Sequence, residues 1–144
     1  MAESILRSAG ADKFNSFSAG SIPSGKVHPV ALELLERFDM SAKDARSKSW
    51  DEFAAEDAPK MDFVFTVCDR AAAEICPSWP GQPMSAHWGI ADPAIESNDE
   101  MEVMQRFRTA FAELERRINI FINLPFNALD SMRLQRELDD IGRS

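Results

Sequence analysis

Two cysteines are the residues of this sequence whose type and spacing could carry redox chemistry. Cys68 follows an apolar, β-branched and aromatic run from Met61 to Val67, which is typical of a buried strand, so the thiol falls at that strand's carboxyl end. Ligands bind at this edge of open α/β sheets. Cys76 lies eight residues further on, directly before Pro77, and the chain has no third cysteine. The pair favours a redox-active site over a packing feature.

The spacing of the two thiols limits how they could react with each other. If residues 68–76 formed one continuous helix, the rise of about 1.5 Å per residue would place the two Cα atoms roughly 12 Å apart. A disulfide needs a Cα separation below about 7 Å. A Cys68–Cys76 disulfide therefore requires this segment to loop or unwind. The alternative is two buried, inert cysteines.

An acid–proline pair, Asp92-Pro93, follows the cysteines and could supply acid–base chemistry. A residue before proline is biased to extended geometry, which suits a carboxylate that projects from a loop. A turn or helix-capping aspartate is the alternative. His28 and His87 do not stand at a zinc-ligand spacing from the cysteines. His87 is instead expected to orient the loop that follows it.

The size and charge of the chain narrow the classes of partner. Its 144 residues, 44% of them hydrophobic, fit a single domain over residues 1–144. The net charge is −8 and no block of Lys and Arg stands out, which argues against nucleic acid or an anionic membrane as partner. No run approaches the roughly 20 apolar residues of a membrane span, and the first residues lack the apolar core of a secretion signal. We therefore expect a cytoplasmic protein, in which two thiols are more often reactive or inert than bridged.

Helical and strand patterns alternate along the chain, which predicts an α/β fold. We expect helices over 2–7, from Pro29, over 49–53, over 101–121 and over 129–141. We expect strands over 14–18, 61–68 and 85–90. This order is typical of a three-layer, doubly wound parallel sheet, with residues 125–144 as a C-terminal helical extension. The chain opens on a helix, although such folds usually begin with their central strand.

Several motifs resemble one family over nearly the whole chain. Their order and spacing are similar to those of the arsenate reductases built on the low-molecular-weight tyrosine phosphatase fold. The resemblance implies a four-stranded parallel sheet, a thiolate that attacks arsenate, a second thiol that displaces arsenite and a thiol partner that resets the enzyme. The motifs that carry it are Met1-Ala-Glu3-Ser-Ile-Leu, Phe17-Ser-Ala-Gly-Ser21, Arg46-Ser-Lys-Ser-Trp-Asp-Glu-Phe53, Thr66-Val-Cys68 to Cys76-Pro77, and His87-Trp-Gly with Asp92-Pro-Ala94.

The sequence departs from the family pattern before Met1, where members carry a first strand and a loop of the form Cys, five residues, Arg. Neither cysteine here can replace that loop, because Glu74 and Gln82 stand six residues after Cys68 and Cys76. The loop's thiolate is the nucleophile, and its backbone N–H groups and arginine bind the oxyanion. We expect a start codon or boundary placed about twenty residues too late. A genuine pseudoenzyme is the alternative.

The missing first strand has consequences for the sheet. In the strand order 2-1-3-4 the first strand lies in the middle, so its absence would leave its neighbours without a shared partner. We therefore expect at most three parallel strands, with a gap, a rearranged pairing or a partner chain in the space.

The resemblance also implies roles for particular residues. Cys68 would attack the adduct of arsenate, Cys76 would then attack Cys68, and Asp92 would be the general acid. Thioredoxin or a glutathione/glutaredoxin system would reduce the resulting disulfide, and no bound cofactor or metal is implied. The residue after the acid–proline pair is Ala94, where phosphatases of this fold carry an aromatic residue. This favours a small oxyanion over phosphotyrosine, with a low-molecular-weight phosphatase or a non-catalytic binding remnant as alternatives.

A possible cation position completes the sequence-based expectations. Glu3 and Ser18 match positions that help hold a potassium ion in some of these reductases. The third position, acidic in those proteins, corresponds to Lys48. One hypothesis is that the Lys48 ammonium replaces the charge of the ion; the favoured alternative is a solvated surface lysine.

Overall fold

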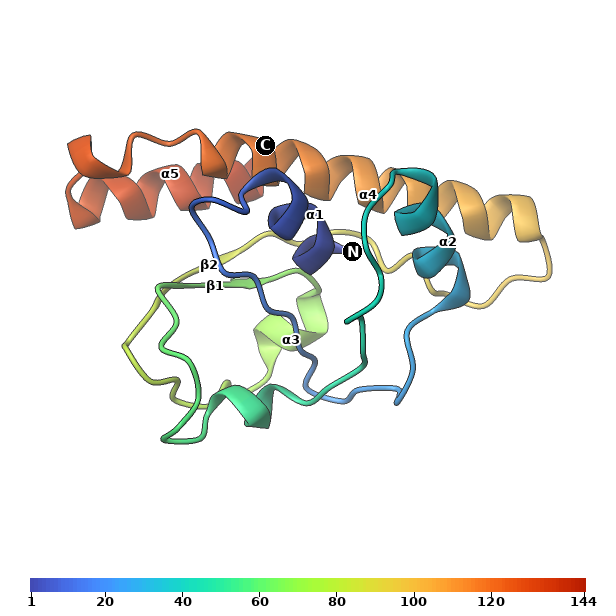
Figure 1. Cartoon of the computed structure of the whole chain (residues 1–144), viewed down its shortest axis with the longest axis horizontal. Helices are drawn as coiled ribbons and strands as arrows, with labels where there is room; N and C mark the ends of the chain where they lie inside the picture. The colour runs from blue at the N-terminus through green and yellow to red at the C-terminus, as the bar shows by residue number, and fades with distance from the viewer.

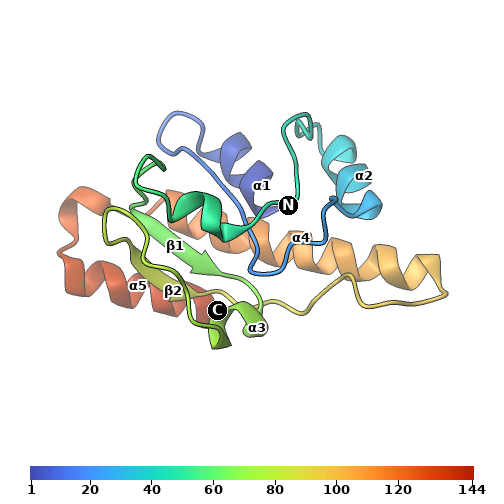
Figure 2. The ribbon, with the colours of Figure 1, turned by 90° about the horizontal axis from the view of Figure 1, so that it is seen from below.

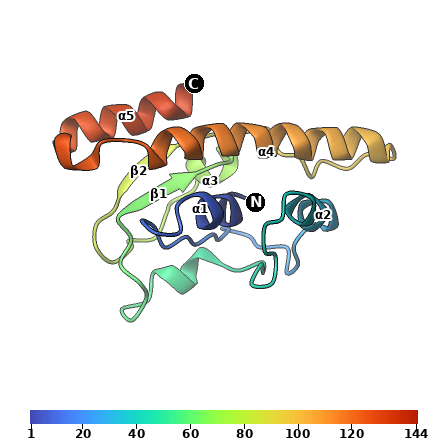
Figure 3. The same ribbon diagram turned by 45° about the horizontal axis from the view of Figure 1, so that its top comes forward.

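The computed structural model describes residues 1–144 and has five α-helices, two short 3-10 helices and a parallel sheet of two strands. Helices α4 and α5 lie on one side of the sheet and η1 on the other (Figure 1 and Figure 3). None of the helices is long and apolar enough to cross a membrane. In chain order the elements are α1 (Ala2–Ala9), α2 (Pro29–Arg37), η1 (Trp50–Phe53), β1 (Phe63–Thr66), α3 (Asp69–Ala73), β2 (Met84–His87), α4 (Glu100–Ile122), η2 (Phe126–Ala128) and α5 (Ser131–Arg143).

Helix α4 is the longest element and organises the core. Its N-cap residue is Asp99, whose Oδ1 accepts hydrogen bonds from the backbone N–H groups of Met101 and Glu102 at 3.0 and 3.4 Å. Such caps satisfy N–H groups that have no partner within the helix. One face of α4 is buried and contacts α1, α2 and α5. The apolar side chains of this helix were expected to form a buried stripe that starts at Met101, but Met101 is 83% exposed. The stripe is buried further along, at Phe107, Phe111, Leu114, Ile118 and Phe121.

The sheet pairs β1 with β2 in parallel, with Phe63 opposite Met84 and Thr66 opposite His87. Figure 2 shows the two arrows side by side and pointing the same way. The rings of Phe63 and Phe65 each lie 5.2 Å from the ring of Phe121, centroid to centroid, so the sheet is bound to α4 by aromatic packing.

Helix α5 covers β2 at close range. Leu138 is fully buried, and its backbone carbonyl accepts a hydrogen bond from the Trp88 indole N–H at 2.9 Å. A Cβ on Gly142 would lie 2.3 Å from the carbonyl oxygen of His87, a distance that no side chain can occupy. Glycine at this position therefore allows the helix to approach the end of β2.

Most elements expected from the sequence are present, within a few residues of the expected bounds. The five expected helices correspond to α1, α2, η1, α4 and α5, and two of the expected strands to β1 and β2. The sheet has two strands, within the expected limit of three. The short helix α3, over residues 69–73, had no separate sequence signal.

The strand expected over residues 14–18 is wrong. The segment is not a strand; an isolated parallel bridge between Gly20 and Ser49 lies two residues beyond it. The apolar and polar residues of this segment still make different contacts. The ring of Phe14 lies 5.0 Å from that of Phe121, and the Ser16 hydroxyl donates a hydrogen bond to the Glu3 carbonyl oxygen at 2.9 Å. A strand also needs a hydrogen-bonded neighbour, and this segment has none.

Candidate functional site

Cys68 lies at the carboxyl end of β1, where the chain turns into α3. Its backbone is extended, with φ −123° and ψ 147°, and its Sγ accepts a hydrogen bond from the backbone N–H of Ala71 at 3.4 Å. The sulfur thus takes the place that a Ser or Asp oxygen holds in an ordinary helix cap. The thiol is half-buried and forms no disulfide. The predicted position at the edge of the sheet is confirmed.

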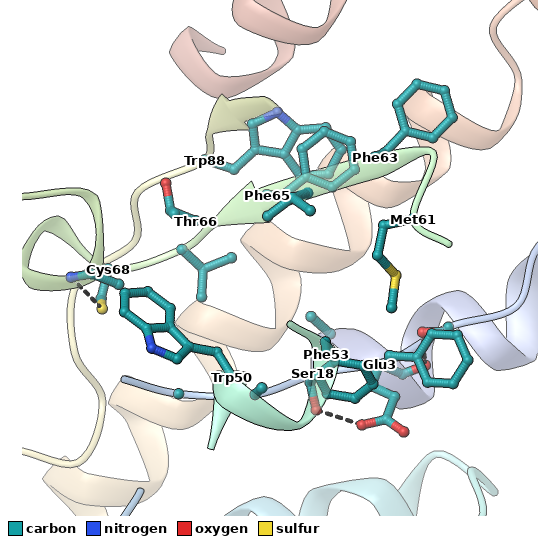
Figure 4. Close-up of a pocket in the computed structure, with 18 of the residues that line it drawn as sticks. Glu3, Ser18, Trp50, Phe53, Met61, Phe63, Phe65, Thr66, Cys68 and Trp88 are labelled. Carbon is teal, nitrogen blue, oxygen red and sulfur yellow. Dashed lines mark hydrogen bonds between the residues drawn. The ribbon is translucent and has the colours of Figure 1, made fainter. Parts of the chain in front are cut away.

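A cavity of about 400 Å³ extends from Cys68 along β1. It lies between β1 and the segment Ser16–Gly20, and 18 of its 25 lining residues are hydrophobic. Trp50 and Trp79 both line it, with their rings in an edge-to-face arrangement at a centroid distance of 6.1 Å. Figure 4 shows Trp50 beside Cys68, with Glu3 and Ser18 further along the cavity. One thiol therefore meets a largely apolar space that has a few polar groups.

One polar group of this cavity, the carboxylate of Glu3, has several hydrogen-bond partners. Glu3 accepts hydrogen bonds from the Ser18 hydroxyl and from Arg7 at 2.7 Å, and its Oε2 lies 3.3 Å from the Lys48 ammonium. Burial alone would raise the pKa of Glu3, but the Ser18 hydrogen bond and the Lys48 charge outweigh it and the pKa is lowered. Lys48 is 5% exposed in its side chain and also donates to the carbonyl oxygen of Arg46 at 3.4 Å.

The structure therefore brings Glu3, Ser18 and Lys48 together, which is the arrangement that the hypothesis of a Lys48 counter-charge requires. Lys48 is a buried cation rather than a solvated surface residue. No group of three or more His, Cys, Asp or Glu side chains is arranged so that it could hold a metal ion.

The other two predicted site residues lie outside the cavity. Cys76 is exposed and follows α3, which already ends at Ala73; Glu74 is extended, with ψ 156°. Asp92 is exposed on the loop after β2, and its Oδ1 accepts a hydrogen bond from the backbone N–H of Ala94 at 2.9 Å. The structure thus joins Cys68 to the cavity but does not bring Cys76 or Asp92 into it.

Sequence reasoning missed a set of contacts beside Cys68. The Thr66 hydroxyl and His87 Nδ1 are 2.8 Å apart, and His87 Nε2 is 2.8 Å from the Asp69 carboxylate. The three residues lie at the ends of β1 and β2 and at the start of α3. They are 18 and 21 positions apart in the chain, so only the parallel register of the strands reveals their proximity.

A buried arginine supports the end of β2. Arg117, 6% exposed, donates from Nη1 to the carbonyl oxygens of Trp88 and Gly89, each at 2.9 Å. Its Nε is buried without a hydrogen-bond partner. Arg117 lies on α4 next to the buried Ile118, and nothing in the sequence alone indicates its burial, because arginine is usually exposed.

The fold and the site together define the class of this protein. It is an α/β protein whose candidate site has a thiol at the carboxyl end of a parallel strand, beside a cavity. The sequence profile of the low molecular weight phosphotyrosine protein phosphatase family matches residues 1–137. The chain belongs to that family.

Similar proteins share one description. The arsenate reductase of Halalkalibacterium halodurans is 31% identical over 110 residues, 76% of each chain. Arsenate reductase 1 of Bacillus cereus is 34% identical over 108 residues, 75% of each chain. A solved structure, described as an arsenate reductase in reduced state, superposes with a TM-score of 0.63 at 26% identity and covers 84% of each chain.

Proposed function

We propose that this protein is an oxidoreductase that takes part in the thiol-dependent reduction of arsenate to arsenite. The observation that carries the proposal is the arrangement of its two cysteines. Cys68 lines a cavity at the sheet edge, Cys76 is exposed after a five-residue helix, and both thiols are free. Relatives that cover three quarters of the chain are arsenate reductases.

The proposed reaction uses the thiols in sequence. A first thiolate attacks arsenate and forms a sulfur–arsenic bond. Cys68 then attacks that sulfur; the sulfur–arsenic bond breaks, its electron pair reduces arsenic, and arsenite leaves. Cys76 attacks Cys68 in turn, which releases the first thiolate and leaves a Cys68–Cys76 disulfide. An external reductant supplies the two electrons that reduce this disulfide, either the dithiol of thioredoxin or two thiol equivalents of a glutathione/glutaredoxin system.

Asp92 is the proposed general acid for the leaving oxygen of arsenate. Its carboxyl group is exposed on the loop that leaves β2 at the same edge of the sheet as Cys68. The hydrogen bond that it accepts from Ala94 fixes the loop without covering the carboxyl group. Because no aromatic residue follows Asp92-Pro93, the site suits a small oxyanion better than an aryl phosphate.

The first thiolate is not among these residues, since no arginine stands six positions after either cysteine. Its place in the fold is suggested by β1. The carbonyls of Asp62 and Thr66 bond to β2, so by the alternation of a parallel ladder the backbone groups of Phe63 and Phe65 face away from β2. The cavity lies along β1, and β2 is the only hydrogen-bonded neighbour of β1.

We therefore place a central strand between β1 and the segment Ser16–Gly20, in the strand order 2-1-3-4, with helices on both faces. Such a strand would end beside Cys68, where its following loop would hold the oxyanion. Residues 1–144 would then form one domain, with residues 125–144 as its helical end.

Controlled oxidation tests the thiol relay. One equivalent of hydrogen peroxide should convert both thiols into an intramolecular Cys68–Cys76 disulfide with release of two waters, visible by peptide mass spectrometry without reductant. Cys68→Ser and Cys76→Ser should each abolish the linked peptide. Thioredoxin with its reductase should restore both thiols. Oxidation that leaves Cys68 and Cys76 unlinked would contradict the relay and favour a non-catalytic binding protein.

A further inference from the structure

A hydrogen-bonded set of three side chains surrounds the point where Cys68 joins β1 to α3. Thr66, the last residue of β1, bonds to His87 Nδ1, and His87 Nε2 bonds to Asp69, the first residue of α3. Both distances are 2.8 Å. Cys68 stands between the two residues that His87 holds. We call Thr66, His87 and Asp69 the β2 clamp, because its central residue ends β2.

Both ring nitrogens of His87 are used in either protonation state. In the neutral ring, Nε2–H donates to the Asp69 carboxylate, which is acceptor-only when ionised, and Nδ1 accepts from the Thr66 hydroxyl. In the imidazolium both nitrogens donate, and the hydroxyl turns to accept. The clamp therefore persists whatever the charge of the ring, and its effect is one of position rather than of proton transfer.

The backbone that follows His87 leaves space for the β2 clamp and is held by hydrogen bonds. A Cβ on Gly89 would lie 2.7 Å from His87 Nε2 and 3.0 Å from Asp69 Oδ1, closer than side-chain atoms pack. Arg117 donates hydrogen bonds of 2.9 Å to the two carbonyls that follow His87, those of Trp88 and Gly89. His87 is therefore attached to a fixed strand end, whereas α3, which it holds, has five residues and no buried side chain.

We propose that His87 is a positioning residue that holds the first turn of α3 closed and so limits how readily Cys76 reaches Cys68. This inference rests on the proposed relay, in which Cys68 must leave its position as the cap of α3 to bond to Cys76. With α3 formed, Cys68 caps the helix and Cys76 stays in solvent. Loss of the clamp releases Asp69 and lets the first turn open.

The size of the expected effect follows from exposure. The side chains of His87 and Asp69 are 40% and 96% exposed, so the contact contributes little to the stability of the whole fold. The same free energy is a larger share of the stability of a five-residue helix than of the whole fold. We expect α3 to open about fivefold more often without it, the factor that corresponds to about 1 kcal/mol.

An aromatic disulfide reagent separates the reaction of Cys76 with the reagent from the later closure of the Cys68–Cys76 disulfide. The exposed Cys76 reacts first, forms a mixed disulfide and releases one coloured aryl thiolate. Cys68 then attacks Cys76, displaces the second aryl thiolate and closes the Cys68–Cys76 disulfide. The first phase measures only the exposure of Cys76 and serves as an internal control. The second phase measures how often α3 opens.

We expect His87→Ala and Asp69→Ala to accelerate the second phase about fivefold and to leave the first phase unchanged. Asp69→Asn should restore the normal rate, because its amide oxygen still accepts from Nε2–H. Gly89→Ala should accelerate the phase without removing a polar group, and Asp12→Ala, at an exposed site away from the clamp, should not.

Three results would overturn the inference: an unchanged or slower second phase in His87→Ala and Asp69→Ala, Asp69→Asn behaving as Asp69→Ala, or an accelerated phase in Asp12→Ala. Should His87→Ala fail to fold, as judged by circular dichroism, Asp69→Ala and Gly89→Ala decide. A wild-type chain that shows no second phase would instead contradict the relay itself, so the two failures are distinguishable.

Discussion

Glu3 is the residue at which most charged contacts of the cavity converge. Ser18, Arg7 and Lys48 all donate to its carboxylate, and its side chain is only 12% exposed. A buried carboxylate is costly unless it is paired and hydrogen-bonded. Lys48 supplies the buried member of that pairing, whereas Arg7 is 42% exposed. The ammonium therefore acts as a built-in counter-ion within the protein.

Replacing Lys48 by methionine should destabilise the protein by about 2 kcal/mol, because it removes the buried counter-charge of the Glu3 carboxylate. Urea unfolding measures the loss. Lys43→Met, at an exposed lysine, should change the free energy of unfolding by less than about 0.5 kcal/mol. Adding Glu3→Gln to Lys48→Met should recover much of the loss; equal losses in the single and double variants would contradict the pairing.

The position of Lys48 leads to a prediction of how potassium affects the stability of the protein. If the Lys48 ammonium takes the place of a bound cation, exchanging sodium chloride for potassium chloride at equal ionic strength leaves the wild-type unfolding midpoint unchanged. A midpoint that rises with potassium in the wild type would show that an ion binds beside Lys48.

Glu3 also predicts a loss of stability in acid. Because the pKa of Glu3 is lowered from 4.5 in the folded protein, its contribution is complete above the unfolded value and is lost as the pH falls through the folded one. The free energy of unfolding should therefore decline below about pH 4.5 more steeply in the wild type than in Glu3→Gln. Urea unfolding between pH 5 and about pH 3 compares the two. Parallel curves would contradict the lowered pKa.

At the scale of the elements, the predictable parts are those whose pattern is satisfied locally. The helix of α4 is predicted from the spacing of its apolar residues, and the apolar run of β1 predicts the position of Cys68. The alternation over residues 14–18 resembles that of a strand, but strand formation depends on a neighbour that no local pattern encodes. The β2 clamp could not be predicted for the same reason, since strand register brings its residues together.

The cap of α4 offers a test at this scale. Asp99→Ala removes the acceptor for the N–H groups of Met101 and Glu102 and should cost about 1 kcal/mol, whereas Asp99→Asn should cost a few tenths. Thermal or urea unfolding measures both, with Asp12→Ala as the exposed control. Because α4 carries the core, we expect the cost to appear as cooperative destabilisation of the whole protein. Fraying confined to the first turn, with an unchanged midpoint, would contradict this coupling.

At the scale of the whole molecule, the cavity beside β1 borders both the edge of the sheet and the Cys68 thiol. It is lined mainly by apolar side chains, and β1, which borders it, has β2 as its only neighbouring strand. An unpaired strand edge is a template for an added strand. The same space lies next to Cys68, so an element that fills it could complete both the sheet and the site.

A peptide can test this coupling. We expect an apolar five-residue strand followed by a Cys-x5-Arg loop to raise the melting temperature of the 144-residue chain and to give arsenate turnover in the presence of thioredoxin and its reductase. Replacing the peptide cysteine by serine should abolish turnover but keep the thermal shift. A proline at the centre of its strand should abolish both, because proline removes a ladder hydrogen bond. Turnover without a thermal shift would separate the chemistry from the cavity and contradict the placement of a strand beside β1.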